Sequence, residues 1–520
     1  MCDWSGFGRV LLASILSCFV WAAGARAETC LADASAVPQA IEDQPLDSAA
    51  LADFYTAVEG ACVWRASDAA ALLQAIDALP LHAIDPAPFH PALIRARLLA
   101  RDEAAQAETD LLLTDAALRY ARAMTAGLVP PGRVDEDWDF PQPELDHAAA
   151  LRAALAEQTL GAWLASLPPA DPAYRGLMQA LVRYRAIAAD GGWQRLPSGA
   201  TLHPKESDPR LPALRARLVV EGDLEAGAVS DSPRFDPDAV TGLKRFQVRH
   251  GITPDGVLGL ATFTALNVPV DKRIDQIAAN LERWRWMARA MPATRVEVNV
   301  AGAEMKLLID GTVTMRMRTV VGDAKHRSPI LVAEAGSVLL NPPWRVPVSI
   351  IRKEIMPKVR NQPDYLAQND MQWIGDHLVQ APGPKNALGR LKLEVRDRFD
   401  VYLHDTPAQA AFARDQRWLS HGCVRLERPL DLALALLAGK PGAGREDLEA
   451  AIAAGATHRI FLPQQVTVVL AYWTAEAQED GRTIFHDDIY GRDARLVRHL
   501  GRGWMQPHPP EVAEAVAISG

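Results

Sequence analysis

The hydrophobic pattern of residues 40–200 has the period of α-helices. Apolar side chains recur there every three or four positions, which places them on one face of a helix. One such helix is expected to begin with Ser67 as its N-cap and to carry Leu72, Ile76 and Leu79 on its buried face. The region holds no cluster of histidine, cysteine or paired carboxylates at catalytic spacing, so we expect a helical scaffold.

A smaller helical module is predicted for residues 207–268. Asp255-Gly256 marks a tight turn within it, because glycine adopts positive φ at low cost. The turn lies between the second and third of three expected helices, which span residues 211–219, 238–250 and 259–266. These elements predict a compact three-helix unit.

From residue 295 the pattern changes to the two-residue alternation of strands. Residues 295–300 alternate between polar and apolar side chains, and residues 304–309 lead into the hairpin turn Asp310-Gly311. Further strands are expected at residues 315–321, 337–340, 391–395 and 401–404. Strands at this frequency predict a β-rich catalytic domain.

Residues 346–384 interrupt this pattern. They are rich in proline, basic and aromatic residues and show no strand alternation. Long irregular inserts in compact domains are usually binding loops or lids, so we expect an inserted lid subdomain over a site. The fold class is therefore predicted to be multidomain α+β.

Length and composition are those of a globular protein with several domains. A chain of 520 residues is too long for one compact core, and 49% hydrophobic and 23% charged residues are ordinary proportions. The formal net charge of −9 gives no electrostatic reason to expect a nucleic-acid partner.

The N-terminus predicts export. An almost wholly apolar stretch over residues 10–23 leads to Ala25-Arg26-Ala27, a small-x-small cleavage signal. The stretch is shorter than the roughly 20 residues that a membrane span needs. We expect residues 1–27 to be a signal peptide, with a lipoprotein signal through Cys18 as the alternative.

Cysteine usage draws attention to Cys423. Cys2 and Cys18 would leave with the signal peptide, so three cysteines remain. In an oxidising compartment the simplest pairing joins Cys30 to Cys62 and leaves Cys423 as a free thiol. Such a bridge would contribute about 3 to 4 kcal/mol on the loop-entropy model. Three free thiols are the alternative.

The most distinctive chemistry lies in the run Ser420-His421-Gly422-Cys423-Val424-Arg425. A thiol is a good nucleophile only as the thiolate, and a histidine within hydrogen-bond reach can take its proton. We expect His404 to be this proton acceptor, because it ends a predicted strand upstream of Cys423. His421 is less well placed, since the connecting backbone limits its approach.

The neighbours of Cys423 are expected to shape the site. Ser420 and Arg425 can supply orienting hydrogen bonds, and Gly422 lets backbone N–H groups come close to an acyl oxyanion. A zinc site from His404, His421 and Cys423 is the chemical alternative, although the usual zinc-ligand spacings are absent. No Gly-x-Ser-x-Gly elbow and no His-Glu-x-x-His helix occurs, which excludes the serine-hydrolase and zincin classes.

The run around Cys423, with a histidine after an upstream strand, resembles the YkuD-like catalytic domain of the L,D-transpeptidase family. Asn341-Pro342-Pro343-Trp344 and residues 382–389 and 487–493 resemble its large multidomain YcbB-type subfamily. Leu243, Phe246-Gln247 and the Asp255-Gly256 turn resemble the peptidoglycan-binding domain of cell-wall enzymes. Small family members have His-Gly-Thr where this chain has His404-Asp405-Thr406, and Asp405 is expected either to orient a ring or to cap a turn.

The resemblance implies a domain order. It comprises a signal peptide (1–27), a helical scaffold (28–206), a peptidoglycan-binding-like domain (207–268), a linker helix (269–294), an L,D-transpeptidase catalytic domain (295–471, with the lid at about 346–384) and a C-terminal extension (472–520).

The resemblance also implies a two-step acyl transfer without a cofactor or metal. Cys423 would attack the carbonyl between the third and fourth residues of a peptidoglycan tetrapeptide stem, with His404 as proton acceptor and donor. An amine of a second stem would take the acyl group and give a 3→3 cross-link. A cell-envelope protein could be the acceptor instead. Carbapenems would acylate the same thiol, in a periplasmic, cell-wall-associated enzyme. An L,D-carboxypeptidase or endopeptidase, and a non-catalytic protein that binds cell-wall glycan, are the alternatives.

Overall fold

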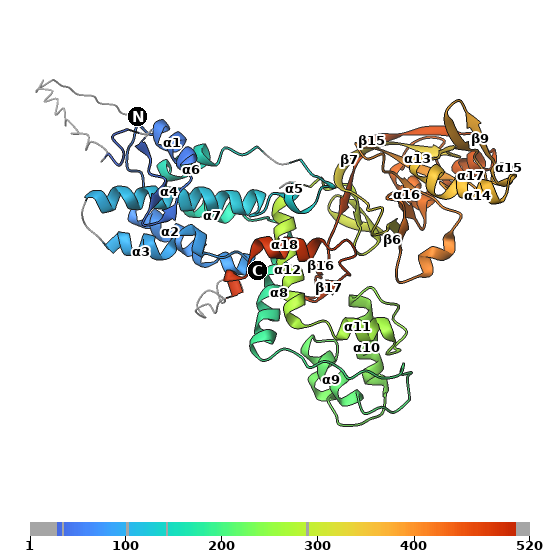
Figure 1. The fold of residues 1–520 in the computed structure, drawn as a ribbon, viewed down its shortest axis with the longest axis horizontal. Coiled ribbons are helices and arrows are strands. Elements are labelled where there is room, and N and C mark those ends of the chain that lie inside the picture. The colour runs from blue at the N-terminus through green and yellow to red at the C-terminus, as the bar shows by residue number, and fades with distance from the viewer. Residues whose placement is uncertain (1–28, 34–35, 100–102, 142–143, 288–290, 506–520) are drawn as a thin grey trace, which may run out of the picture.

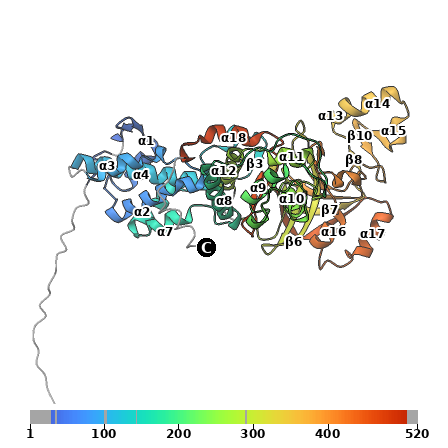
Figure 2. The ribbon, with the colours of Figure 1, turned by 90° about the horizontal axis from the view of Figure 1, so that it is seen from below.

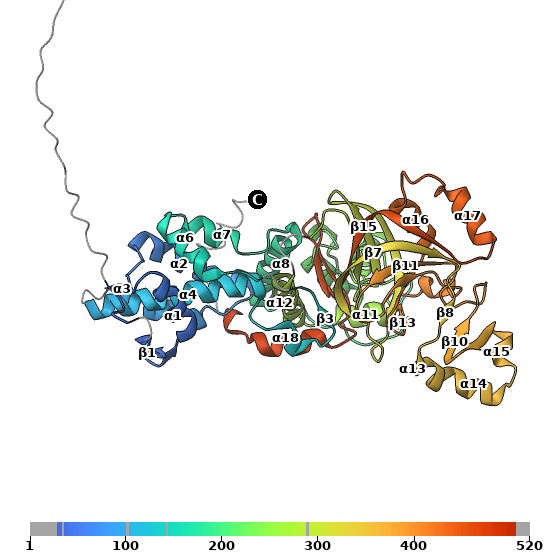
Figure 3. The same ribbon diagram turned by 90° about the horizontal axis from the view of Figure 1, so that it is seen from above.

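The computed structural model describes residues 29–33, 36–99, 103–141, 144–287 and 291–505. Figure 1 shows a helical domain at one end, a β-rich domain at the other and a small helical module beside their junction. Figure 2 and Figure 3 show the same division from below and above. The multidomain α+β class is thus confirmed, whereas the expected signal peptide lies outside the described residues.

The N-terminal helical domain packs around α4 (Glu103–Ala126), whose Leu112 is fully buried with Leu72 and Ile76 in one core. The prediction for Ser67 is wrong: the N-cap of helix α2 is Arg65, two residues earlier, and Ala69 N–H already donates to the Arg65 carbonyl. Leu79, also expected in that helix, begins a separate 3₁₀ turn. The elements are β1 (Ala40–Ile41), β2 (Gln44–Pro45), α1 (Ser48–Ala57), α2 (Ala66–Asp77), η2 (Leu79–His82), η3 (Ala87–Phe89), α3 (Pro91–Leu99), α4, α5 (Pro131–Val134), β3 (Trp138–Asp139), α6 (His147–Ala156) and α7 (Leu160–Ser166).

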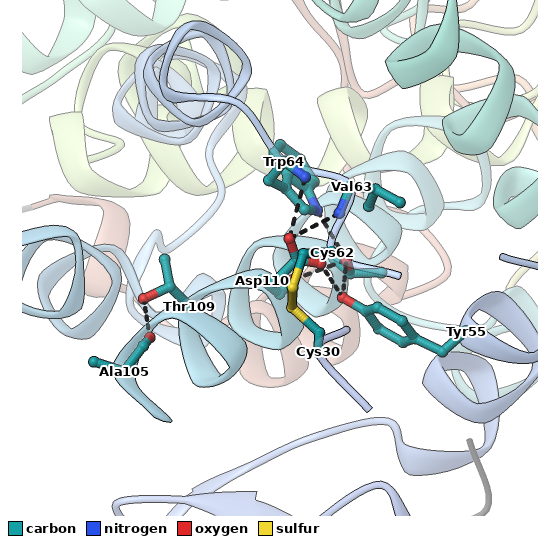
Figure 4. The surroundings of a disulfide bond; sticks show 9 residues. Cys30, Tyr55, Cys62, Val63, Trp64, Ala105, Thr109 and Asp110 are labelled. Atoms are coloured by element: carbon teal, nitrogen blue, oxygen red, sulfur yellow. Dashed lines mark hydrogen bonds between the residues drawn. A yellow bond between two sulfur atoms is a disulfide. The ribbon is translucent and has the colours of Figure 1, made fainter. Parts of the chain in front are cut away.

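A disulfide joins Cys30 to Cys62 in this domain (Figure 4). Beside it, the Asp110 carboxylate of α4 accepts hydrogen bonds from the Val63 and Trp64 N–H groups at 3.0 and 3.1 Å. Tyr55 donates to the same carboxylate at 2.6 Å. The segment after Cys62 is therefore held against α4 by both covalent and hydrogen bonds.

The module of residues 207–268 has its own core of leucine and phenylalanine side chains, among them Leu243 and Phe246. The expected turn forms at Gly256, where φ is +76°. Gln247 holds this turn, because its side chain accepts from Gly256 N–H and donates to the Asp255 carboxylate. The elements are α9 (Leu211–Val220), η4 (Ala226–Ala228), α10 (Pro237–Arg249) and α11 (Leu260–Leu266).

Two long helices, α8 (Pro172–Ala189) and α12 (Val270–Trp286), connect the three parts. Glu282 of α12 is fully buried, and its carboxylate accepts from the Leu128 and Val129 N–H groups of the helical domain at 2.6 and 2.8 Å. Arg285 neutralises this carboxylate at 2.5 Å. None of the helices in the described part of the chain is long and apolar enough to cross a membrane.

The β-rich domain is built on one ten-stranded mixed sheet. Its strand order is β11-β12-β14-β6-β5-β4-β15-β7-β3, β13 pairs with β6, and an additional β11–β7 pairing closes the sheet on itself. Alternate side chains of β4 and β5, such as Val296, Val298 and Met305, are fully buried, as the sequence pattern predicts. The strands and flanking helices are β4 (Arg295–Asn299), β5 (Glu304–Ile309), β6 (Thr312–Gly322), β7 (Ile330–Leu340), β11 (Leu391–Arg396), β12 (Leu403–His404), η6 (Gln409–Ala413), β13 (Trp418–Ser420), β14 (Val424–Leu426), α16 (Pro429–Leu436), α17 (Arg445–Ala453) and β15 (His458–Ala471).

The insert between β7 and β11 is a small folded unit, which corrects the expectation of an irregular segment without strands. Ile350, Ile355 and Leu378 form a separate core in it, and three of its strands pair in the order β8-β10-β9. The alternation of polar and apolar side chains is not recognisable in this segment, because its strands are only two to four residues long. The elements are β8 (Trp344–Arg345), α13 (Val348–Ile350), the π-helical turn η5 (Ile351–Ile355), α14 (Met356–Asn361), α15 (Tyr365–Gln368), β9 (Met371–Ile374) and β10 (His377–Gln380).

The segment after residue 471 returns to the long helices. Its elements are β16 (Ala475–Ala477), β17 (Thr483–Phe485), α18 (Arg492–Leu500) and η7 (Gly503–Met505). An unstructured tail is the natural expectation from the glycines and prolines after Arg492, but α18 buries Leu496 and Leu500. Asp493 of α18 forms an ion pair with Arg283 of α12 at 2.6 Å, so this helix is part of the junction.

Candidate active site

A cavity of about 330 Å³ lies between the large sheet and the insert. Five of the six site residues expected from the sequence line it, and the sixth, Gly422, lies in the turn before Cys423. The lining from the sheet side consists of Tyr402, His404, Ser420, His421, Cys423 and Arg425, and the lining from the insert side includes Trp344, Ile350, Glu354, Lys358 and Tyr365.

The pairing of β12 with β14 brings the expected nucleophile and base together. The two strands are parallel, with Leu403 opposite Val424 and His404 opposite Arg425. Val424 N–H donates to the Tyr402 carbonyl at 3.1 Å, which continues the ladder one residue further. Cys423 directly precedes β14, so the register places its side chain beside the end of β12.

The turn that presents Cys423 is held by serine side chains. Ser420 Oγ donates to the Cys423 carbonyl at 2.6 Å and accepts from Gly422 N–H at 3.1 Å. Ser328 Oγ donates to the Gly422 carbonyl at 2.6 Å. Gly422 has φ +113°, a conformation that L side chains rarely adopt, so this turn requires glycine. Because the Gly422 amide is already engaged, it is not a ready oxyanion donor.

His404 is buried and neutral. Its Nδ1–H donates to the Asp405 carbonyl at 2.5 Å, since a carbonyl can only accept, and this leaves Nε2 as the unprotonated nitrogen. Burial, followed by the charge of Arg425, lowers the pKa of His404 to about 3. At neutral pH the ring is therefore a hydrogen-bond acceptor at Nε2 and carries no charge.

The thiol of Cys423 is half-buried, and burial raises its pKa above 9.0. Hydrogen bonds from the backbone and the phenol of Tyr402, and the charge of Lys392, act in the opposite direction on this pKa. Within the described residues no hydrogen bond joins Cys423 Sγ to His404, and Sγ lies 4.0 Å from the Asp400 carbonyl oxygen. The resting pair is a thiol beside a neutral imidazole.

Arg425 brings positive charge to the cavity wall. Its Nε is buried and has no hydrogen-bond partner among the described residues. Of the basic residues in the insert, Lys358 also lines the cavity, where its Nζ lies 3.5 Å from Tyr365 Oη. Two cations therefore face a space that the thiol also faces, an arrangement suited to a substrate with carboxylates.

His421 contacts the insert, and its contacts do not indicate a role as base for the thiol. Its Nε2 lies 2.6 Å from a carboxylate oxygen of Glu354 in η5. On the other side its ring packs against His326, with centroids 4.6 Å apart. His421 therefore links the loop that carries Cys423 to the insert.

Lys392 is a neighbour of the thiol that the sequence did not indicate. Lys392 lies opposite His404 across the β11–β12 pair, with its Nζ 3.9 Å from the centre of the Tyr402 ring. The two-residue alternation of β11, with Leu391 and Leu393 buried, could have placed Lys392 on the other face. Asp405 caps a turn, because its carboxylate accepts from Arg390 N–H at 2.9 Å.

Three family models match separate parts of the chain. The "Scaffold domain" model matches residues 49–181, the "Putative peptidoglycan binding domain" model matches residues 207–266, and the "L,D-transpeptidase catalytic domain" model matches residues 293–442. The last of these ranges contains the cavity described above, together with the insert.

A curated protein of Haemophilus influenzae named "Putative L,D-transpeptidase" is 27% identical over an alignment of 219 residues that covers 38% of this chain. The chain covers 44% of the length of that relative. The solved structures of L,D-transpeptidases from Xylanimonas cellulosilytica and Stackebrandtia nassauensis are 15% and 14% identical, each over 53% of this chain and over 98% and 97% of their own. Their TM-scores of 0.18 and 0.22 are too low to support an argument about the fold.

The matches confirm the resemblance to an L,D-transpeptidase catalytic domain and to a peptidoglycan-binding domain that the sequence indicates. The chain thus carries an L,D-transpeptidase catalytic domain together with a scaffold domain and a peptidoglycan-binding domain.

Proposed function

We propose that the chain is a cysteine-dependent L,D-transpeptidase that forms 3→3 cross-links between peptidoglycan stem peptides. The observation that carries this proposal is the strand register that brings Cys423 and His404 to one cavity, which the insert covers. The proposed domain boundaries are those predicted from the sequence, and the proposed location is the cell-wall side of the membrane after export.

The first step transfers an acyl group to the thiol. As Cys423 Sγ attacks the carbonyl carbon of the third stem residue, His404 Nε2 takes the thiol proton. The tetrahedral intermediate then collapses, and His404 returns the proton to the nitrogen of the departing D-alanine. Because the resting pair is uncharged, proton transfer and attack belong to one general-base step.

The second step reverses these roles. An amine of a second stem attacks the thioester carbonyl, His404 takes its proton, and Cys423 leaves as the thiol. The N–H of Cys423 is the candidate donor to the oxyanion, because the Gly422 amide is bonded to Ser420. Arg425 and Lys358 are positioned to bind the carboxylates of the stem.

The test is incubation of the purified protein with tetrapeptide stems, followed by mass spectrometry. A cross-linked dimer supports transfer, whereas tripeptide alone supports the L,D-carboxypeptidase or endopeptidase alternative, in which water resolves the same thioester. Neither product would favour a non-catalytic wall-binding protein. His404→Ala should abolish the dimer, and His458→Ala, at an exposed site in β15, is the matched control.

A further inference from the structure

A second cavity of about 330 Å³ lies between the peptidoglycan-binding module and the catalytic domain. Its walls come from the end of α10 and from α11 on one side, and from the segment before β13 and the segment after β17 on the other. Figure 1 shows α10 and α11 below the β-rich domain on the side where β17 lies. We call this space the interdomain cleft.

The interdomain cleft is closed at one end by direct bonds between the two domains. The Asp415 carboxylate accepts from Thr253 N–H at 3.0 Å and from Thr253 Oγ1 at 2.5 Å. Gly302 allows the opposite wall to approach, because a Cβ there would lie 2.9 Å from His486 Cε1. The cleft is therefore a fixed feature of the domain junction, of a size within the roughly 300–1,000 Å³ range of ligand sites.

The chemistry of the walls suits an uncharged sugar. Trp418 offers a half-exposed indole, and Leu260, 81% exposed on α11, adds an apolar rim. Gln416 can donate to and accept from hydroxyl and acetamido groups, and the exposed Asp487 carboxylate accepts from hydroxyls. The walls carry charge of both signs, with the Asp415 and Asp487 carboxylates facing the Arg273 guanidinium across the same space, so neither sign predominates.

The interdomain cleft and the catalytic cavity lie at the two ends of β13. Trp418 lines the former, and Ser420, His421 and Cys423 line the latter. Five residues from Trp418 to Cys423 span at most about 17 Å, and three stem residues extend to about 11 Å before the lactoyl link is added. With the lactoyl link added, the reach of a stem is of the same order as the span of β13.

We propose that the interdomain cleft is a saccharide subsite that holds an N-acetylated glycan strand and directs its stem along β13 to Cys423. The delivery of the stem rests on the proposed transpeptidase function, but glycan binding does not. Binding and catalysis can therefore be tested separately.

The experiment measures binding of chitotetraose and of peptide-free peptidoglycan strands to the full chain by calorimetry. Leu260→Glu should raise the Kd at least tenfold, and Trp418→Ala should do the same if circular dichroism shows that it folds. Val248→Glu, on an exposed apolar position of α10 outside the cleft, is the matched control and should leave Kd unchanged.

The inference is overturned if the unmodified chain binds neither glycan, if Leu260→Glu binds as tightly as the control, or if only free stem peptide binds. Acylation of Cys423 by a carbapenem should be equal in Leu260→Glu and Val248→Glu. Loss of acylation in the unmodified chain would instead count against the proposed function and would not contradict glycan binding in the cleft.

Discussion

Replacing Gly422 by alanine should damage catalysis far more than stability. At φ +113° an alanine is strained, and its Cβ would lie 3.3 Å from the Arg327 carbonyl oxygen. Strain of this kind costs about 1 to 3 kcal/mol. For a domain of the size of the catalytic domain this corresponds to a fall in unfolding temperature of about 2 to 12 °C. Relief of the strain would shift the neighbouring Cys423, and a displacement of about 1 Å can slow a positioned reaction by ~10²-fold.

The assay is the rate of Cys423 acylation by a carbapenem, measured beside thermal unfolding. Gly455→Ala is the matched control, because Gly455 also has positive φ, +74°, but a Cβ there meets nothing within 4 Å. The control should lose some stability and keep its acylation rate. Wild-type acylation in Gly422→Ala, or an equal loss in Gly455→Ala, would refute the role given to this turn.

Three further changes have defined outcomes. Glu354→Gln removes a half-exposed ion pair with His421, of the class worth about 0.2–1 kcal/mol, so acylation should slow by no more than about fivefold; a loss above 100-fold would indicate a direct chemical role. Because the pKa of Cys423 is raised above 9.0, alkylation by iodoacetamide should increase about tenfold per pH unit from pH 6 to 8, and a flat profile would indicate a preformed thiolate–imidazolium pair. Replacing Cys30 and Cys62 by serine opens a link across 32 residues and should lower stability by about 3 to 4 kcal/mol in urea unfolding, while unchanged stability would contradict the bridge.

The sequence allowed the placement of His404 and Cys423 at one cavity to be anticipated, because His404 ends one predicted strand and Cys423 lies in a motif downstream of it. Strand ends in one sheet are brought together by topology, so a histidine after one strand and a cysteine before another are natural partners. Lys392 could not be predicted in the same way to lie near the thiol. Its position depends on the β11–β12 register, which joins residues through tertiary pairing rather than through local pattern.

Two other features of the structure could not be predicted from the sequence, each for its own physical reason. Glu354 contacts His421 through a π-helical turn in the insert, and such a turn leaves no periodic trace in a segment this short. Helix α18 is not evident from composition, because glycines and prolines follow residue 500, although the i, i+4 pair Leu496 and Leu500 is a helical signal. In both cases tertiary packing stabilises an element that local composition does not favour.

Cys423 is proposed as the acyl-accepting nucleophile of this chain, activated by His404. Intact-protein mass spectrometry after incubation with a carbapenem tests it most directly. We expect one covalent adduct per chain, mapped to Cys423, that is absent in Cys423→Ala and forms at least 100-fold more slowly in His404→Ala. An unmodified mass in the wild-type chain, or an adduct that persists in Cys423→Ala, would contradict it.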